Sequence, residues 1–350
     1  MEASPSSILV VLIAGIGDLV LASPSLRAVR NRYPDADIHL ITSTDALPVA
    51  RHYRMVDQVT AFPIRELRRS KKHLLQIPGL LWGLRQKKFT LAVNLFRVSS
   101  LRGAIKMGLL FLSLGTKSKI GHDNHGFGLF LTAAVPADTF TGRHVADAML
   151  EIALKAGGVP DALGTEVFWD AEVGAKWDHF FTPLAGEIVV GIHPGGDRET
   201  RRWHPDRFAA VAEKIARQFH ARIILLGGPS ETDLAARVGS RLPSNVTVNL
   251  SGKVPVDELA CLISRLDLLL TNDSGPMHIA AATKTPVVAL FGPGDPLLNG
   301  PYTQPELYRV IRKEVLCDRP CGVKRCSHLS CLDLIAPEEV AAACAELLNG

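Results

Sequence analysis

The chain has 350 residues, of which 47% are hydrophobic and 21% charged, which is enough material for two domains with ordinary cores. No apolar run approaches the roughly 18 to 20 residues that cross a bilayer. The short apolar run near the N-terminus follows no basic segment, so we expect neither a membrane span nor a secretory leader. The modest net charge of +4 predicts no nucleic-acid partner, and six cysteines without a leader fit the reducing cytoplasm.

The first predicted unit is a strand over residues 8–13, a glycine-rich turn, and an amphipathic helix to about Tyr33. A dinucleotide-binding fingerprint would place glycine at position 20, where this chain has Val20, so that interpretation is weak. Asp18 stands in the turn, at the carboxyl edge of the expected sheet, where α/β proteins bind ligands. An ordinary helix N-cap would look the same, and both interpretations stay open.

Strands and helices then alternate. The pattern predicts strands at 38–42, 56–61 and 90–95 and helices near 71–86 and 99–113. Such alternation is typical of an α/β fold with a doubly wound parallel sheet.

The basic residues of this first half are unevenly placed. The runs RELRRSKKH at 65–73 and RQKK at 85–88 flank apolar segments, and LRGAIKMGLLFLSLGTK combines an apolar face with basic ends. These helices fit a surface that touches the anionic inner membrane, but ordinary core-facing helices explain them at least as well.

The pattern loosens between Pro160 and about Pro183. We therefore expect an N-terminal domain over 1–165, a linker over 166–185, a C-terminal domain over 186–335 and a final helix over 336–350.

A second alternating series follows the linker. It comprises strands at 187–192, 222–226 and 246–249 and helices at 205–219, 231–242 and 256–266. A glycine-rich or polar cluster follows the end of each main strand, as in His193-Pro194-Gly195-Gly196. Four loops of this domain are therefore expected to face one cleft.

The stretch Leu269–Asp295 continues that series. It divides into a strand ending at Leu270, a polar turn, a small-residue helix through Ala282, and a strand over 286–291 that ends in a second glycine-rich loop. Two loops thus converge on one anion-sized space.

The polar turn in this stretch carries Asn272, Asp273, Ser274 and Gly275. Either Asp273 or Ser274 can cap the helix, whose exposed amides favour a phosphate. His278 lies one helical turn later, so its ring can return to the same place. A capped, alanine-rich helix also occurs without any ligand, and a lone histidine is more often a packing residue.

Between the first strand of this domain and its helix lies the segment DRETRRWHP. Arg201 and Arg202 can reach a phosphate while Trp203 packs beneath them, although surface arginines are usually only solvated.

These motifs together resemble glycosyltransferase family 9, the lipopolysaccharide heptosyltransferase family. The resemblance is carried by ILVVLIAGIGDLVLASPSLRAVRNRYPDADIHLIT, HPGG with RRWHPDRF, TNDSGPMHIAAA with FGPGDP, and the cysteine-bearing tail. It implies a GT-B fold, with two Rossmann-like domains facing across a cleft, and inverting transfer of a heptose from ADP-heptose to a lipid-linked or core oligosaccharide. The N-terminal domain would hold the acceptor and the C-terminal domain the nucleotide-sugar donor.

The resemblance also implies roles for individual residues. Asp18 corresponds to the catalytic base and Arg201 to the basic phosphate contact, where arginine replaces lysine. The donor-binding residues are expected to be His193, Gly195, Gly196, Arg201, Asp273, Ser274, Gly275 and His278. No metal or other cofactor is expected, because helix amides and cations can stabilise the leaving group.

Two other function classes stay open. A nucleotide-sugar epimerase or hydrolase would consume the donor without any acceptor. A catalytically silent binding protein would bind the nucleotide, and substitution of Asp18 would then change nothing measurable.

Four of the cysteines, Cys317, Cys321, Cys326 and Cys331, lie close together in the sequence. Four thiolates could bind zinc, but their separations lack the paired CxxC knuckles of most structural sites. We expect a reduced, metal-free loop that braces the donor site, and we leave zinc and an occasional disulfide as alternatives.

Overall fold

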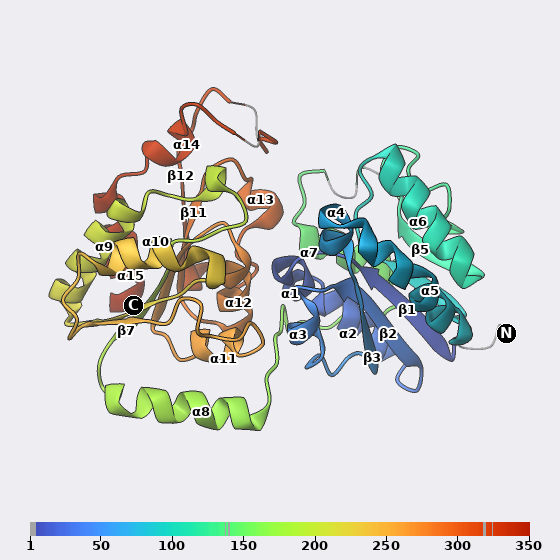
Figure 1. Ribbon diagram of the computed structural model, residues 1–350, viewed down its shortest axis with the longest axis horizontal. Helices are drawn as coiled ribbons and strands as arrows, with labels where there is room; N and C mark the ends of the chain where they lie inside the picture. The colour runs from blue at the N-terminus through green and yellow to red at the C-terminus, as the bar shows by residue number, and fades with distance from the viewer. Residues whose placement is uncertain (1–4, 137, 139–140, 318–319, 324) are drawn as a thin grey trace. The chain divides into compact units, whose positions relative to one another are not determined.

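The computed structural model describes residues 5–136, 138, 141–317, 320–323 and 325–350. Its packing divides the chain into two units, which we call the N-terminal unit (Met1–Glu166) and the C-terminal unit (Val167–Gly350). Each unit contains one parallel six-stranded sheet with helices around it (Figure 1). The α/β fold with doubly wound parallel sheets, predicted from the alternation of strands and helices, is therefore confirmed.

The N-terminal sheet has the strand order β3-β2-β1-β4-β5-β6. The strands are β1 Ser7–Leu12, β2 Asp37–Ser43, β3 Gln58–Phe62, β4 Leu91–Asn94, β5 Ser118–His122 and β6 Ala133–Val135. The apolar run Ile8 to Val11 is fully buried, as expected for a central strand covered on both faces. The order of the strands reverses between β1 and β4, and α/β sheets bind ligands beyond the carboxyl ends at such a switch point.

The helical elements of this unit are α1 Ile16–Leu21, α2 Ser23–Arg32, α3 Leu47–Ala50, α4 Ile64–Arg69, η1 Lys71–Gln76, α5 Ile77–Gln86, α6 Leu101–Leu114 and α7 Val145–Lys155. No element is predicted from the sequence between 115 and 159, yet β5, β6 and α7 lie there. β5 mixes polar and apolar residues and β6 has only three residues, so neither strand forms an apolar run long enough to mark it.

The single helix predicted to reach Tyr33 is wrong in one respect, because it is broken at Ala22. Pro24 has no N–H to donate to the carbonyl of Val20, and its ring would clash with that carbonyl in a continuous helix. The Ser23 hydroxyl donates to the same carbonyl instead, at 2.7 Å. The chain therefore ends α1 and begins α2 with Pro24 in its first turn.

The C-terminal sheet has the strand order β12-β11-β10-β7-β8-β9, which repeats the pattern of the first sheet. The strands are β7 Val189–His193, β8 Arg222–Leu225, β9 Thr247–Asn249, β10 Leu268–Asn272, β11 Val287–Phe291 and β12 Tyr308–Arg312. The switch point lies between β7 and β10. The loops that follow these two strands carry most of the predicted donor-binding residues.

The helical elements of the C-terminal unit are α8 Ala171–Phe181, η3 Thr182–Leu184, η4 Glu199–Arg201, α9 Pro205–Phe219, η5 Pro229–Glu231, α10 Thr232–Gly239, α11 Leu259–Ile263, α12 Gly275–Thr283, α13 Pro296–Asn299, η6 Pro305–Leu307, α14 Ser330–Asp333 and α15 Pro337–Asn349. Buried residues of α9, α10 and α15 form one core with alternate residues of β7, β8, β10 and β11. The helix predicted over 256–266 is wrong in length, because only α11 forms there.

The segment 166–185 contains α8, which packs within the C-terminal unit. The indole N–H of Trp177 donates to Glu258 at 3.0 Å, and the Lys176 ammonium lies 2.6 Å from the same carboxylate. These contacts attach α8 next to α11. None of the helices in the described ranges combines the length and the apolar character that crossing a bilayer requires.

Candidate active site

Asp18 lies in the first turn of α1, just beyond the carboxyl end of β1. Its Oδ2 atom accepts a hydrogen bond from the backbone N–H of Gly15, 3.3 Å away, so the side chain does contribute to the cap of the helix. A carboxylate keeps further lone pairs when it accepts one such bond, and Asp18 is partly exposed. The side chain thus lies at the switch point beside β1, where α/β proteins bind ligands.

In the C-terminal unit, β10 extends two residues further than the sequence predicts, to Asn272 rather than Leu270. The extension is buried, and Asn272 uses both ends of its amide. Its Oδ1 accepts from the backbone N–H of Trp203 at 3.0 Å, and its Nδ2 donates to the carbonyls of Pro194 and Gly195 at 3.0 and 2.9 Å. Asn272 thus fixes the loop after β7 against the end of β10.

His193 ends β7 and is buried between three side chains. Its Nδ1 lies 3.1 Å from the Thr271 hydroxyl and 3.3 Å from the Ser274 hydroxyl, and its Nε2 lies 3.3 Å from Oε2 of Glu231. The imidazole therefore links the loops after β7, β8 and β10.

Glu231 holds two of these loops through their backbone amides. Its Oε1 accepts from the N–H of Gly196 and its Oε2 from the N–H of Gly228, each at 2.8 Å. Burial alone would raise the pKa of Glu231. The hydrogen bond and electrostatic attraction from His193, together with the hydrogen bonds from the two backbone amides, outweigh this effect. The pKa falls to about 2. Glu231 is thus ionised at neutral pH, and both of its carboxylate oxygens accept hydrogen bonds.

At two points where the loops approach one another, a side chain in place of glycine would collide with a carboxylate. A Cβ on Gly195 would lie 2.1 Å from Oε1 of Glu231, and a Cβ on Gly294 would lie 2.4 Å from Oδ2 of Asp273. Gly196 has more room, because the nearest atom to its Cβ position is 3.7 Å away on Arg202. The loop after β11 thus reaches the turn after β10, as the two converging glycine-rich loops predict.

Arg201 and Asp273 form an ion pair with Nη1 and Oδ2 3.4 Å apart. Burial raises the pKa of Asp273, while the Arg201 guanidinium lowers it. Arg202 is occupied elsewhere, because its Nε and Nη2 donate to the carbonyl of Gly196 at 2.9 and 2.6 Å. Trp203 is buried and contacts Phe208 edge to face, as expected of a residue packed beneath the arginines.

Ser274 is the N-cap residue of α12, but the prediction that Ser274 or Asp273 caps the helix with its side chain is wrong. The Ser274 hydroxyl lies 3.0 Å from the Thr271 hydroxyl and 3.3 Å from His193 instead, which satisfies two buried groups. Gly275 begins α12, and His278 lies one turn later, buried. The amide end of α12 therefore reaches the same edge of the sheet as His193.

The model of glycosyltransferase family 9 (heptosyltransferase) matches residues 80–329 of this chain. The chain belongs to glycosyltransferase family 9. Among its relatives is lipopolysaccharide heptosyltransferase 3 of Escherichia coli, which is 26% identical over 306 residues that cover 82% of this chain and 84% of the relative.

Solved structures agree in fold. The family 9 glycosyltransferase of Veillonella parvula aligns with a TM-score of 0.81 at 23% identity, over 100% of this chain and 99% of its own. The E. coli ADP-heptose lipopolysaccharide heptosyltransferase II aligns with a TM-score of 0.75 at 22% identity, over 98% of both chains. The resemblance stated from the motifs, the GT-B type of fold with two Rossmann-like domains, and the assignment as a glycosyltransferase are confirmed.

The cysteine loop of this glycosyltransferase lies against the loop that follows β11. Cys321 donates its backbone N–H to the carbonyl of Pro293 at 2.9 Å, so the loop contacts the segment after β11, as a bracing role predicts. The side chains around one small cavity there include Cys317, Cys321, Cys326, Cys331 and His328. Within the described ranges, no three Cys, His, Asp or Glu side chains lie where they could hold a metal ion together.

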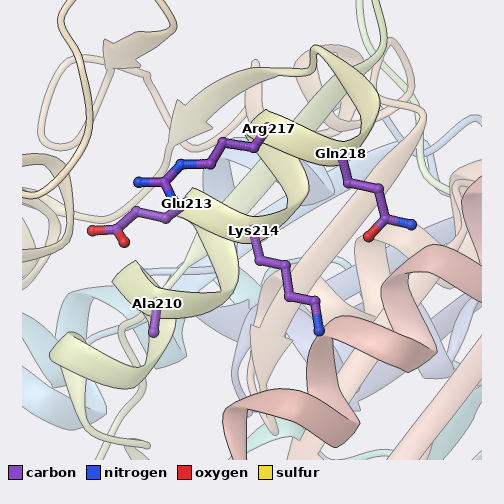
Figure 2. A pocket seen from close by; sticks show the side chains of 5 residues that line it. All are labelled: Ala210, Glu213, Lys214, Arg217 and Gln218. Carbon is purple, nitrogen blue, oxygen red and sulfur yellow. The ribbon is translucent and has the colours of Figure 1, made fainter.

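A different concavity lies on the surface of α9 and includes none of the predicted site residues. Figure 2 shows its side chains, which all come from α9: Ala210, Glu213, Lys214, Arg217 and Gln218. A hollow lined by one helix lacks the converging loops at the carboxyl ends of strands where α/β proteins bind ligands.

Sequence reasoning misses Glu231, Thr271 and Asn272. Glu231 falls in a segment expected only to begin a helix, and its partners come from other loops. Thr271 directly precedes the polar turn and Asn272 is its first predicted residue, so their position next to the expected donor-binding residues is a signal. Their burial was not foreseen, because buried polar residues are recognised only once their partners are known.

Proposed function

We propose that this protein transfers a heptose from ADP-heptose to the lipopolysaccharide core or a similar glycan, with inversion at the anomeric carbon. Membership of family 9 supports the transferase class. The donor is suggested by the name of the E. coli heptosyltransferase II, which has the same fold. One observation carries the proposal: His193, Arg201, Ser274 and the start of α12 gather at the switch point of the C-terminal sheet.

That edge suits a nucleotide diphosphate. Arg201 supplies a permanent cation, oriented by Asp273, and the amide end of α12 supplies partial positive charge. Glu231 and Asn272 hold the surrounding loops in place, so their groups need little reorganisation when the leaving group gains charge.

Asp18 is the proposed base. It takes the proton from the acceptor hydroxyl as that oxygen attacks the anomeric carbon of the donor sugar. The bond from the anomeric carbon to the diphosphate oxygen breaks on the opposite face, and its electron pair leaves with ADP. The products are a glycoside of inverted configuration, ADP, and protonated Asp18, which returns its proton to water.

No metal or other cofactor is part of this scheme. Two charges develop, one on the acceptor oxygen and one on the diphosphate, and the scheme assigns Asp18 to the first and Arg201 with the α12 amides to the second. The absence of a metal requirement is itself part of the proposal, and elemental analysis tests it.

The acceptor in the proposed reaction is lipid-linked. We therefore propose that the protein acts in the cytoplasm at the inner face of the inner membrane. Binding to that surface would raise the local concentration of acceptor without any span crossing the bilayer.

The test is incubation of the protein with a panel of nucleotide sugars, with and without a lipopolysaccharide-core acceptor, while nucleotide diphosphate release is measured. We expect release that depends on both ADP-heptose and the acceptor. Consumption of the donor at equal rates without acceptor would instead indicate a hydrolase or epimerase. Tight binding without turnover would indicate a binding protein.

A further inference from the structure

The outer face of α6 exposes a stripe of large aliphatic side chains. Leu101, Ile105, Leu109 and Leu112 are 65%, 54%, 60% and 73% exposed. At about 100° per residue these four positions fall within an arc of roughly 80° on the helix, so they form one continuous strip. We call this strip the α6 stripe.

The α6 stripe is not the face by which the helix joins the fold. The opposite face buries Met107, Leu110, Phe111 and Leu114, and Phe111 stacks on Phe130 with ring centroids 5.6 Å apart. Ser100 caps the start of the helix by accepting from the N–H of Gly103 at 3.2 Å. α6 is thus packed against the fold by one apolar face, and a second apolar face stays exposed. Leucines scattered singly over a surface would not form such a continuous strip.

Basic residues border the α6 stripe on one side. Arg102 and Lys106 are exposed and lie along one border of the stripe, between it and the buried face. Residues 63–122 contain thirteen Lys or Arg and one acidic residue, Glu66, whereas the whole chain has 39 Lys or Arg and 35 Asp or Glu. The rest of the chain therefore has 26 basic and 34 acidic residues, so the positive charge is concentrated in this segment.

A second set of exposed apolar side chains lies on the neighbouring elements η1 and α5. Leu75 and Trp82 are 86% and 66% exposed. The Arg85 guanidinium donates to the carbonyl of Ser113 at 2.7 Å and so joins the end of α5 to the end of α6, which lie side by side in Figure 1. Tryptophan next to basic residues is a typical composition of a membrane–water interface.

We infer that the α6 stripe and its basic border are a docking surface for an anionic lipid bilayer, in which α6 lies parallel to the membrane with its leucines among the acyl chains. The charge distribution selects this occupant, because anionic headgroups complement the exposed Arg102 and Lys106 beside the stripe and the excess of basic residues in this segment of the sequence. A second copy of the chain would bring two such segments together and repel. The inference rests on the proposed function only for its purpose, which is to bring the enzyme to a lipid-linked acceptor.

The surface is tested by sedimentation of the full-length protein with vesicles of phosphatidylcholine alone or mixed with phosphatidylglycerol. We expect binding to the mixed vesicles, weakened by salt, and little binding to the neutral ones. The double variant Leu109→Gln/Leu112→Gln should bind the mixed vesicles at least about tenfold more weakly, since each leucine loses its burial among acyl chains.

Two further variants sharpen the test. Arg102→Gln/Lys106→Gln should weaken binding about tenfold or more, because each basic residue near an anionic surface contributes roughly fivefold to partitioning. The matched control Leu163→Gln/Leu334→Gln removes leucines that are 64% and 57% exposed elsewhere, and should bind like the parent. Circular dichroism of each variant shows whether its fold is retained.

Activity separates this inference from the proposed function. With a delipidated, water-soluble core saccharide, the α6 variant should turn over like the parent, whereas with acceptor in mixed vesicles it should be slower. Vesicle binding needs no substrate, so it tests the docking inference even if the protein turns over no acceptor. Unchanged vesicle binding by a folded α6 variant would overturn the inference. So would loss of a dimer from solution on the same substitution, because the stripe would then be a contact between copies.

Discussion

Nη1 of Arg201 lies 3.4 Å from Oδ2 of Asp273, and so joins the segment before α9 to the turn after β10. Asp273 is 5% exposed, and burial raises its pKa while Arg201 opposes that shift. The pair holds the guanidinium next to the start of α12. Under the proposed function, the same cation neutralises part of the diphosphate charge.

Replacing Arg201 by alanine should weaken ADP binding by about 1.5 to 3 kcal/mol, the usual contribution of a hydrogen bond to a charged group. Isothermal titration with ADP measures the change. Arg198→Ala is a matched control, since Arg198 lies in the same segment, its side chain is 45% exposed, and its Nε lies 3.6 Å from Oδ2 of Asp197. Equal affinity in Arg201→Ala and the parent would remove Arg201 from the site.

Glu231→Gln should destabilise the C-terminal unit by roughly 1 to 3 kcal/mol, because a neutral amide cannot accept from both Gly196 and Gly228 as the carboxylate does. The pKa of Glu231 in the folded protein is about 2, below its ordinary value of 4.5. Its contribution to the free energy of unfolding is therefore fully present above pH 4.5 and is lost as the pH falls toward 2.

Urea denaturation followed by tryptophan fluorescence, at about pH 6 and about pH 3, measures this dependence. The difference between the parent and Glu231→Gln should shrink at the lower pH. Glu306→Gln, at an exposed position, should show no such change. A difference that stays constant between the two pH values would contradict the account of Glu231.

The neighbouring glycines Gly195 and Gly196 should differ in their tolerance of alanine. A Cβ at Gly195 meets the Glu231 carboxylate at 2.1 Å, whereas at Gly196 the nearest atom is 3.7 Å away. Gly195→Ala should therefore cost about 1 to 3 kcal/mol of stability and weaken ADP binding, while Gly196→Ala should stay within about 1 kcal/mol of the parent. Thermal unfolding and ADP titration compare the stability and the ADP affinity of the two variants. Equal values for both would contradict this prediction and mean that the Glu231 side chain moves aside freely.

The cysteine loop is predicted to be free of metal. Chelation should leave turnover unchanged, and elemental analysis of the purified protein should find no stoichiometric zinc or iron. About one metal ion per chain that disappears in Cys321→Ser would show that the loop is a metal site. Cys344→Ser is the matched control, because Cys344 is buried in α15 outside the loop.

Most strands of both sheets could be predicted from the sequence, because each central strand is an apolar run followed by a polar or glycine-rich turn. The ends of elements were harder. β10 continues through Thr271 and Asn272 because their side chains find buried partners on other loops, and no local pattern reports those partners. β12 is not predicted, since its sequence YRVIR mixes charged and apolar residues without a regular pattern in a partly buried strand.

The candidate site shows the same limit. Motif resemblance identified His193, Arg201 and the turn after β10, and the structure brings these C-terminal residues to one edge of the sheet. Glu231 was missed because its role comes from two backbone amides and an imidazole that lie on different loops. Ser274 was assigned to the cap because a serine before a helix usually caps it, but tertiary contacts with Thr271 and His193 compete successfully for its hydroxyl.

The central claim is that Asp18 is the base of an inverting transferase, and the turnover of Asp18→Asn tests it most directly. Asparagine can still accept the hydrogen bond from Gly15, so the cap of α1 is retained. We predict that kcat with ADP-heptose and a core acceptor falls by about 100- to 10,000-fold, while ADP affinity stays within about threefold of the parent. Turnover near that of the parent would contradict the claim.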